Sequence, residues 1–166
     1  MGAADWTAPT PCEAWTVRDL VRHVVEEDLW ASGLLAGLSL ADAGAQLPAD
    51  PLAPDPAAAT SVAVESALAV ARQPGAADRT VHLSFGDTPA AEYLMQLAAD
   101  HVVHAWDLTT ALHRDDPPPP TLVTAVLAWF GRHEDAYRAA GAIGPRPALP
   151  DNPDDLTRLL AAFGRI

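Results

Sequence analysis

Residues 89–113 read PAAEYLMQLAADHVVHAWDLTTALH, and this stretch decides the fold class. Pro89 suits the first turn of a helix, where its missing N–H costs no hydrogen bond. The apolar residues behind it recur at helical spacing, namely Tyr93, Leu94, Leu97, Val102, Val103, Trp106, Leu108 and Leu112. The stretch therefore predicts one long helix over about 89–113.

Shorter patterns predict the other helices. Thr16 is placed as an N-cap with Asp19 near the positive end of the dipole, so a helix is expected from residue 16 to the glycines Gly33 or Gly37. Further helices are expected over residues 58–72 and 121–141, and a short one over 154–163. Together they predict an all-α antiparallel bundle in a single domain, residues 1–166.

Two segments lack this periodicity. Residues 41–57 are rich in Ala, Pro and Asp, which predicts an exposed loop. Residues 79–85 alternate in polarity and then meet Gly86 and Asp87, which predicts a short extended arm or small hairpin before the long helix.

The composition limits the partners. Ten arginines and no lysine against 22 acidic residues give a formal charge of -12, which disfavours nucleic acid and anionic lipid surfaces. No apolar run approaches the roughly 20 residues that cross a bilayer, so no membrane span is expected. The first residues lack the basic and apolar stretches of a secretory signal, and Cys12 is the single cysteine, so a reducing cytoplasmic location is expected.

Three residues form a candidate metal site. Asp100 and His104 are four positions apart on the long helix, so their side chains lie about 40° apart around its axis. His23 stands among apolar neighbours in the first helix, where a lone imidazole needs a partner. Two imidazoles and a carboxylate suit Zn²⁺ first, and also Ni²⁺, Fe²⁺ or Mn²⁺. An ordinary hydrogen-bonded Asp–His pair is the competing interpretation of the spacing.

Three blocks of sequence carry a family resemblance. Residues 10–23, TPCEAWTVRDLVRH, residues 100–108, DHVVHAWDL, and residues 159–165, LLAAFGR, resemble actinobacterial proteins related to the N-terminal domain of mycothiol-dependent maleylpyruvate isomerase, in the DinB-like superfamily. The resemblance implies a four-helix bundle whose metal is held by a His and an acidic-x-x-x-His pair. These ligands fall on His23, Asp100 and His104, although the isomerase has a Glu where this chain has the shorter Asp100.

The resemblance also indicates a departure at the beginning of the chain. Relatives carry a helix before the tryptophan that aligns with Trp6, and only five residues precede Trp6 here. The family's first bundle helix is therefore expected to be missing or replaced. We expect the apolar face that it leaves to be covered by the short final helix or by a second subunit, which would make a homodimer.

The resemblance implies a thiol-dependent enzyme. A metal-bound low-molecular-weight thiol, mycothiol, would attack a small-molecule electrophile and give an S-conjugate or an isomer. Arg18, Arg22 and Arg79 are the candidate contacts for the thiol. The isomerase has a C-terminal domain for which this chain has no room, so a general S-transferase is expected ahead of that reaction. The rivals are a non-catalytic module that binds metal or a small ligand, and a biosynthetic enzyme with altered chemistry.

Other polar residues are weaker candidates for a functional role. His82 in the extended arm is a candidate general base, and Asp107 either orients a ligand imidazole or pairs with Arg18 or Arg22. His101 points about 100° away from Asp100 and serves as a reserve ligand. Cys12 is expected mainly to pack in its turn. His113 and His133 are expected on solvated faces, without a role.

Overall fold

A computed structural model describes residue 2 and residues 4–165. Its α-helices are α1 (Val17–Leu35), α2 (Leu40–Gly44), α3 (Pro56–Ala71), α4 (Ala90–Ala111), α5 (Pro120–Phe130), α6 (Glu134–Ala139) and α7 (Asp155–Ala162). Strands β1 (Thr80–Leu83) and β2 (Gly86–Pro89) form one antiparallel pair, and short 3₁₀ turns cover Asp5–Thr7 and Ala76–Asp78. The predicted all-α class is confirmed, with this small hairpin as the predicted arm.

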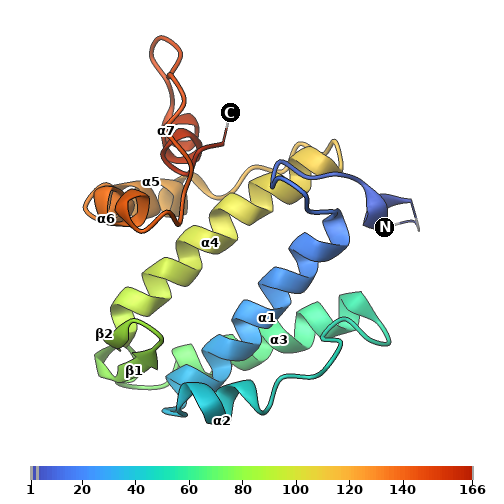
Figure 1. The fold of residues 1–166 in the computed structure, drawn as a ribbon, viewed down its shortest axis with the longest axis vertical. Coiled ribbons are helices and arrows are strands. Elements are labelled where there is room, and N and C mark those ends of the chain that lie inside the picture. The colour runs from blue at the N-terminus through green and yellow to red at the C-terminus, as the bar shows by residue number, and fades with distance from the viewer. Residues whose placement is uncertain (1, 3, 166) are drawn as a thin grey trace.

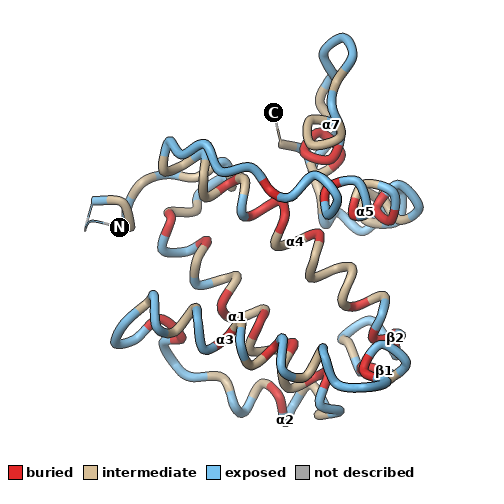
Figure 2. The backbone as a smooth tube through the Cα atoms, turned by 180° about the vertical axis from the view of Figure 1, so that it is seen from behind, coloured by how far each residue is buried: buried red, intermediate tan, exposed pale blue. Residues whose placement is uncertain are grey.

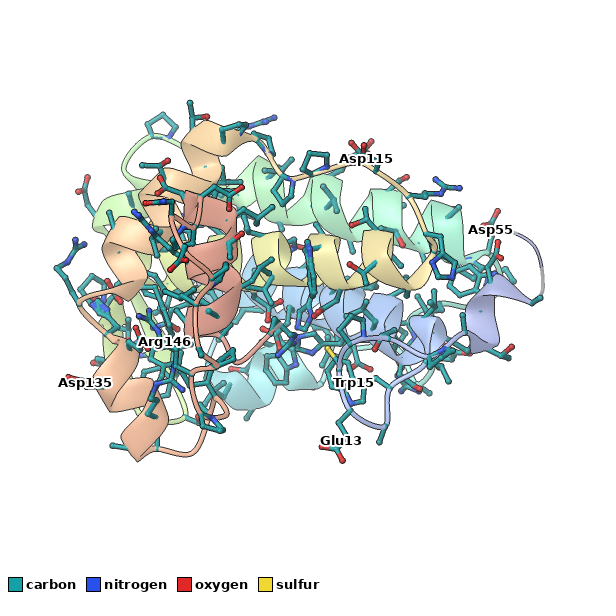
Figure 3. All side chains as sticks on the ribbon, turned by 90° about the horizontal axis from the view of Figure 1, so that it is seen from above. Glu13, Trp15, Asp55, Asp115, Asp135 and Arg146 are labelled. Atoms are coloured by element: carbon teal, nitrogen blue, oxygen red, sulfur yellow. The ribbon has the colours of Figure 1, made fainter. Side chains whose placement is uncertain are left out.

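Three long helices lie side by side. Helix α1 packs against both α3 and α4 (Figure 1). The C-terminal helices run across this layer, as the view from above shows, and α5 packs against α7 (Figure 3). The four-helix bundle expected from the resemblance stays a prediction. Within the described part of the chain, no helix has the length and apolar character needed to cross a membrane.

Local side-chain caps fix where the helices begin. Thr16 and Asp19 form a capping box at α1, in which each side chain accepts a hydrogen bond from the other's backbone N–H. Asp55 caps α3 in a similar way, because its side chain accepts from the N–H groups of Ala57 and Ala58. Asp154 caps α7 by accepting from the N–H of Thr157. The first and last of these starts agree with the sequence prediction.

Two predicted segments need correction. Residues 41–57 are not all loop, since Ser39 caps the short helix α2 and the Asp55 cap starts α3 at Pro56, two residues before the predicted start. Residues 121–141 are not one helix, because the helical structure is interrupted between the end of α5 and the start of α6. At that break the N–H groups of Arg132 and His133 bond to carbonyls three residues back, which tightens and ends α5.

The core has two main parts. One joins the ends of α1 and α3 with the hairpin and the start of α4, and it includes Leu35, Val81 and Tyr93. The other joins α4 to α5 and α7 around Phe130 and Leu159. At the C-terminal end, α7 carries buried residues, whereas the loop that leads to it is mostly exposed (Figure 2). Helix α4 therefore contributes to both parts of the core.

Candidate metal centre

The predicted ligands come from two neighbouring helices. His23 lies in the second turn of α1, whose start is set by the Thr16 cap, and Asp100 and His104 lie in successive turns of α4. Helices α1 and α4 pack against each other. The structure therefore brings His23, Asp100 and His104 together.

Asp100 lies between the two imidazoles. Its Oδ1 is 3.3 Å from Nε2 of His23 and 3.3 Å from Nε2 of His104. One donor atom from each of the three residues lies within 4.8 Å of the other two. Oδ2 of Asp100 is buried and has no hydrogen-bond partner among the described residues. An unpaired carboxylate oxygen beside two converging imidazole nitrogens fits a divalent cation.

The charges at this cluster are strongly coupled. Burial alone would raise the pKa of Asp100, but hydrogen bonds with His104 and His23 outweigh it and hold that pKa well below its usual range. Burial alone would lower the pKa of His104, but hydrogen bonds with Asp100 and Asp107 raise that pKa to about 11. The raised pKa favours a protonated His104 at neutral pH while no metal is bound.

A buried carboxylate orients the His104 ring. Nδ1 of His104 lies 2.9 Å from Oδ2 of Asp107, which is fully buried. When Nδ1 donates its proton to this carboxylate, Nε2 is left to face Asp100 as a ligand. One of the two predicted roles of Asp107, orienting a ligand imidazole, thus agrees with the contacts. The other, pairing with Arg18 or Arg22, is wrong because the guanidinium at Asp107 belongs to Arg165, with Nε 2.9 Å from Oδ1.

Cys12 is more than a packing residue. Its Sγ lies 3.1 Å from Oδ2 of Asp107, 3.1 Å from a guanidinium nitrogen of Arg165 and 3.8 Å from Nδ1 of His104. Cys12, His104 and Asp107 also have donor atoms close enough to share an ion. The Arg165 guanidinium already occupies that contact, and its charge disfavours a second cation there. Cys12 therefore acts within the Asp107 network.

Trp15 covers one side of the cluster. Its ring stacks on His104 with centroids 5.9 Å apart and tilts against His23 at 5.1 Å. The turn that places it needs a left-handed residue, Ala14, at φ 65°. Glu13 in the same turn points outward, whereas Trp15 lies close to the helices (Figure 3).

A cavity of about 260 Å³ opens beside the ligands. Asp100, His104 and Arg165 supply its polar wall, and Tyr137 and Phe163 line the other part. Arg165 is the arginine at this wall, although the sequence had pointed to other arginines.

A second cavity of about 190 Å³ adjoins the first, since Asp100 lines both. Glu27 and Tyr93 contribute to its wall. Burial and the neighbouring Asp100 carboxylate raise the pKa of Glu27 above its usual range. Sequence reasoning missed Glu27, although it stands one helical turn after His23.

The remaining candidates lie elsewhere. Arg18 pairs with Asp50 at 3.3 Å, Arg22 with Glu26 at 2.8 Å, and Arg79 donates to the carbonyl of Leu35 at 2.9 Å. The exposed His82 pairs across the hairpin with Asp87, with Nδ1 and Oδ1 2.7 Å apart. The structure brings none of Arg18, Arg22, Arg79 and His82 to the walls of the two cavities, as far as those walls are described.

Two further histidines have definite neighbours. His101, the reserve ligand, has Nε2 3.1 Å from Oδ1 of Asp28 and turns away from Asp100. His133 packs edge-on against Trp129 and is half-buried, so a solvated face does not describe it. His113 is exposed at the end of α4, as predicted.

Comparison with known proteins agrees with the resemblance. The family described as the mycothiol maleylpyruvate isomerase N-terminal domain matches residues 1–109, which include His23, Asp100 and His104. An uncharacterised protein of Mycobacterium tuberculosis strain CDC 1551 / Oshkosh is 31% identical over 150 residues, covering 87% of this chain and 70% of that protein. An uncharacterised protein of strain ATCC 25618 / H37Rv matches with the same values. No solved structure matches this chain.

Proposed function

This chain belongs to the family of mycothiol maleylpyruvate isomerase N-terminal domains, and on that premise we propose that it is a metal-dependent S-transferase or isomerase. Its substrates would be a small thiol, mycothiol, and a small-molecule electrophile. His23, Asp100 and His104 would hold the metal. Zn²⁺ is the first expectation, and Ni²⁺, Fe²⁺ or Mn²⁺ suit the same donors.

One observation carries the proposal. A single carboxylate oxygen of Asp100 lies 3.3 Å from an Nε2 atom on each side, and its second oxygen is buried without a partner among residues 2 and 4–165. Three protein ligands leave coordination positions open for a substrate. A divalent ion held there would lower the pKa of a bound thiol.

The chain's own residues have distinct tasks in this proposal. Asp107 holds the His104 ring so that Nε2 is the coordinating atom. Arg165 faces the larger cavity and offers a positive charge near a polar substrate group. Glu27 lines the adjoining cavity with a raised pKa, which suits a carboxyl group that takes up or releases a proton during the reaction.

A second candidate function is a non-catalytic module that binds a metal or a small ligand. Arg18, Arg22 and Arg79, expected as thiol contacts, are engaged with Asp50, Glu26 and a backbone carbonyl instead. Because these arginines do not face the metal centre, the support for mycothiol as the substrate is weaker, and the non-catalytic module is favoured by this observation.

Metal content tests the shared premise of both candidates. We expect near-stoichiometric metal in the purified protein by elemental mass spectrometry, and its loss in His23→Ala and His104→Ala. His82→Ala is the matched control, because His82 also pairs with an aspartate but lies in the exposed hairpin. A metal-free protein that takes up neither Zn²⁺, Ni²⁺ nor Mn²⁺ would rule out the metal site.

Turnover separates the two candidates. The metal-loaded protein is mixed with mycothiol and a panel of electrophiles, and both the loss of free thiol and the conversion of each electrophile are followed. An S-transferase consumes thiol, whereas an isomerase converts the electrophile and regenerates the thiol; either activity should be present in the wild type and in His82→Ala but absent in His104→Ala. A protein that holds its metal and yet changes neither thiol nor electrophile is a binding module.

A further inference from the structure

An apolar groove runs between α3 and α4. One stretch of about 190 Å³ is lined by Leu68, Leu94 and Ala31 among others, and a second of about 670 Å³ extends toward Trp6. Val64 lines both stretches. The walls thus come from all three long helices. The final helix, expected from the sequence as one possible cover, packs against α5 instead.

A buried carboxylate stands in the wall of this groove. Asp28 is only 6% exposed, and its Oδ1 lies 3.1 Å from Nε2 of His101. Its Oδ2 is buried and accepts no hydrogen bond from any described residue. Asp28 and His101 both line the smaller stretch, and neither lines the cavities at the metal centre. A buried carboxylate oxygen without a donor is costly, so this position favours a ligand that supplies one.

We propose that the groove binds a small apolar molecule that carries a protonated amine, with the ammonium group donating to Oδ2 of Asp28. The apolar walls suit an aromatic ring or short alkyl chain, since a cavity of about 150 Å³ already holds benzene. A cation is favoured over a neutral donor, because charged hydrogen bonds are the stronger ones and the whole chain carries a formal charge of -12. This site is independent of the proposed enzymatic function.

Paired probes test the proposal on the whole chain. Phenethylamine and 2-phenylethanol have the same ring and spacer, and calorimetry measures their dissociation constants. We expect the amine to bind at least about tenfold more tightly than the alcohol, as a charged hydrogen bond implies. Asp28→Asn should remove that difference while the alcohol still binds.

Two tryptophan variants locate the binding. Leu68→Trp enlarges a partly exposed side chain in the groove wall and should weaken both probes. Val62→Trp is the matched control, because Val62 is an exposed residue of the same helix that lines neither stretch of the groove. If Asp28→Asn fails to fold, the comparison of Leu68→Trp with Val62→Trp still shows whether the probes bind in the groove.

Three results would overturn the proposal. Equal affinity of amine and alcohol in the wild type would remove the role of Asp28. Binding that persists unchanged in Leu68→Trp would place the probes elsewhere. A dimer in light scattering that Leu68→Trp dissociates would show that a second copy of the chain, the other cover expected from the sequence, fills the groove.

Discussion

Nδ1 of His104 lies 2.9 Å from Oδ2 of Asp107, and this contact leaves Nε2 of the same ring 3.3 Å from Asp100. The buried Asp107 thus controls which nitrogen of His104 faces the proposed metal. In metal sites, such partners fix the orientation of the ligand ring and raise its basicity.

We expect Asp107→Asn to weaken the affinity for Zn²⁺ by about 10- to 100-fold, because the amide no longer holds the charged contact that fixes the ring. Competition with a chromogenic chelator measures the change. Asp87→Asn is the control, since it makes the same replacement at the exposed pair with His82. Equal affinities in the two variants would show that Asp107 does not tune the site.

The Arg165 side chain should be important for stability. Its guanidinium bonds both oxygens of Asp107, which has no exposure to water, while the arginine itself is 21% exposed. Arg165→Gln leaves that buried carboxylate with one partner fewer, and we expect a loss of about 3 kcal/mol in the free energy of unfolding, the lower end for a broken buried pair.

Urea unfolding of the metal-free protein measures this loss. Arg158→Gln is the matched control in α7, because Arg158 pairs with Asp155 at the surface, where such pairs contribute about 0–1 kcal/mol. If the Arg165→Gln variant is no less stable than the Arg158→Gln variant, the contact between Arg165 and Asp107 does not stabilise the fold.

Metal uptake should depend on pH. The pKa of His104 is raised to about 11, since hydrogen bonds with Asp100 and Asp107 outweigh burial, so the metal-free ring is protonated at neutral pH. Binding through Nε2 must displace that proton. The affinity for Zn²⁺ should therefore rise with pH, by up to about tenfold per pH unit between about pH 6 and 8.

Calorimetry in buffers of different ionisation enthalpy counts the protons released. We expect the wild type to release about one more proton per bound ion than the His104→Ala variant releases where that variant still binds metal. Uptake without proton release would mean that His104 is neutral before the metal arrives.

The Thr16 cap should stabilise the helix that carries His23. Its side chain accepts a hydrogen bond from the backbone N–H of Asp19. Thr16→Ala should cost about 1 kcal/mol, the usual effect of removing an N-cap. Thermal or urea unfolding measures it against Thr110→Ala, an exposed threonine inside α4. A cost no greater than that of the control would mean that the cap is dispensable.

The helices were predictable where local signals define them. The Thr16 cap and the apolar repeat of residues 89–113 predicted the bounds of α1 and α4 to within about two residues. The start of α3 was missed because the Asp55 cap and Pro56 lie in a stretch whose composition is typical of loops. The break after Phe130 was missed because hydrogen bonds three residues apart, rather than the apolar pattern, end α5.

The site was predictable only in part for a similar reason. Asp100 and His104 share a helix, so their spacing alone brings them together. Cys12 and Arg165 reach Asp107 from segments far away in sequence, and no local pattern encodes those contacts. Asp28 is a comparable case, because its burial depends on how α1 meets α3 and α4.

The contact between Cys12 and Arg165 joins residues 153 positions apart. Contacts of such separation close the largest loops and are costly to form before the rest of the structure is in place. We therefore expect the Asp107 network that orients His104 to be completed late in folding. An ion added to the unfolded chain would meet histidines and carboxylates that are still far apart, so the affinity for metal should reach its full value only after both distant segments have reached Asp107.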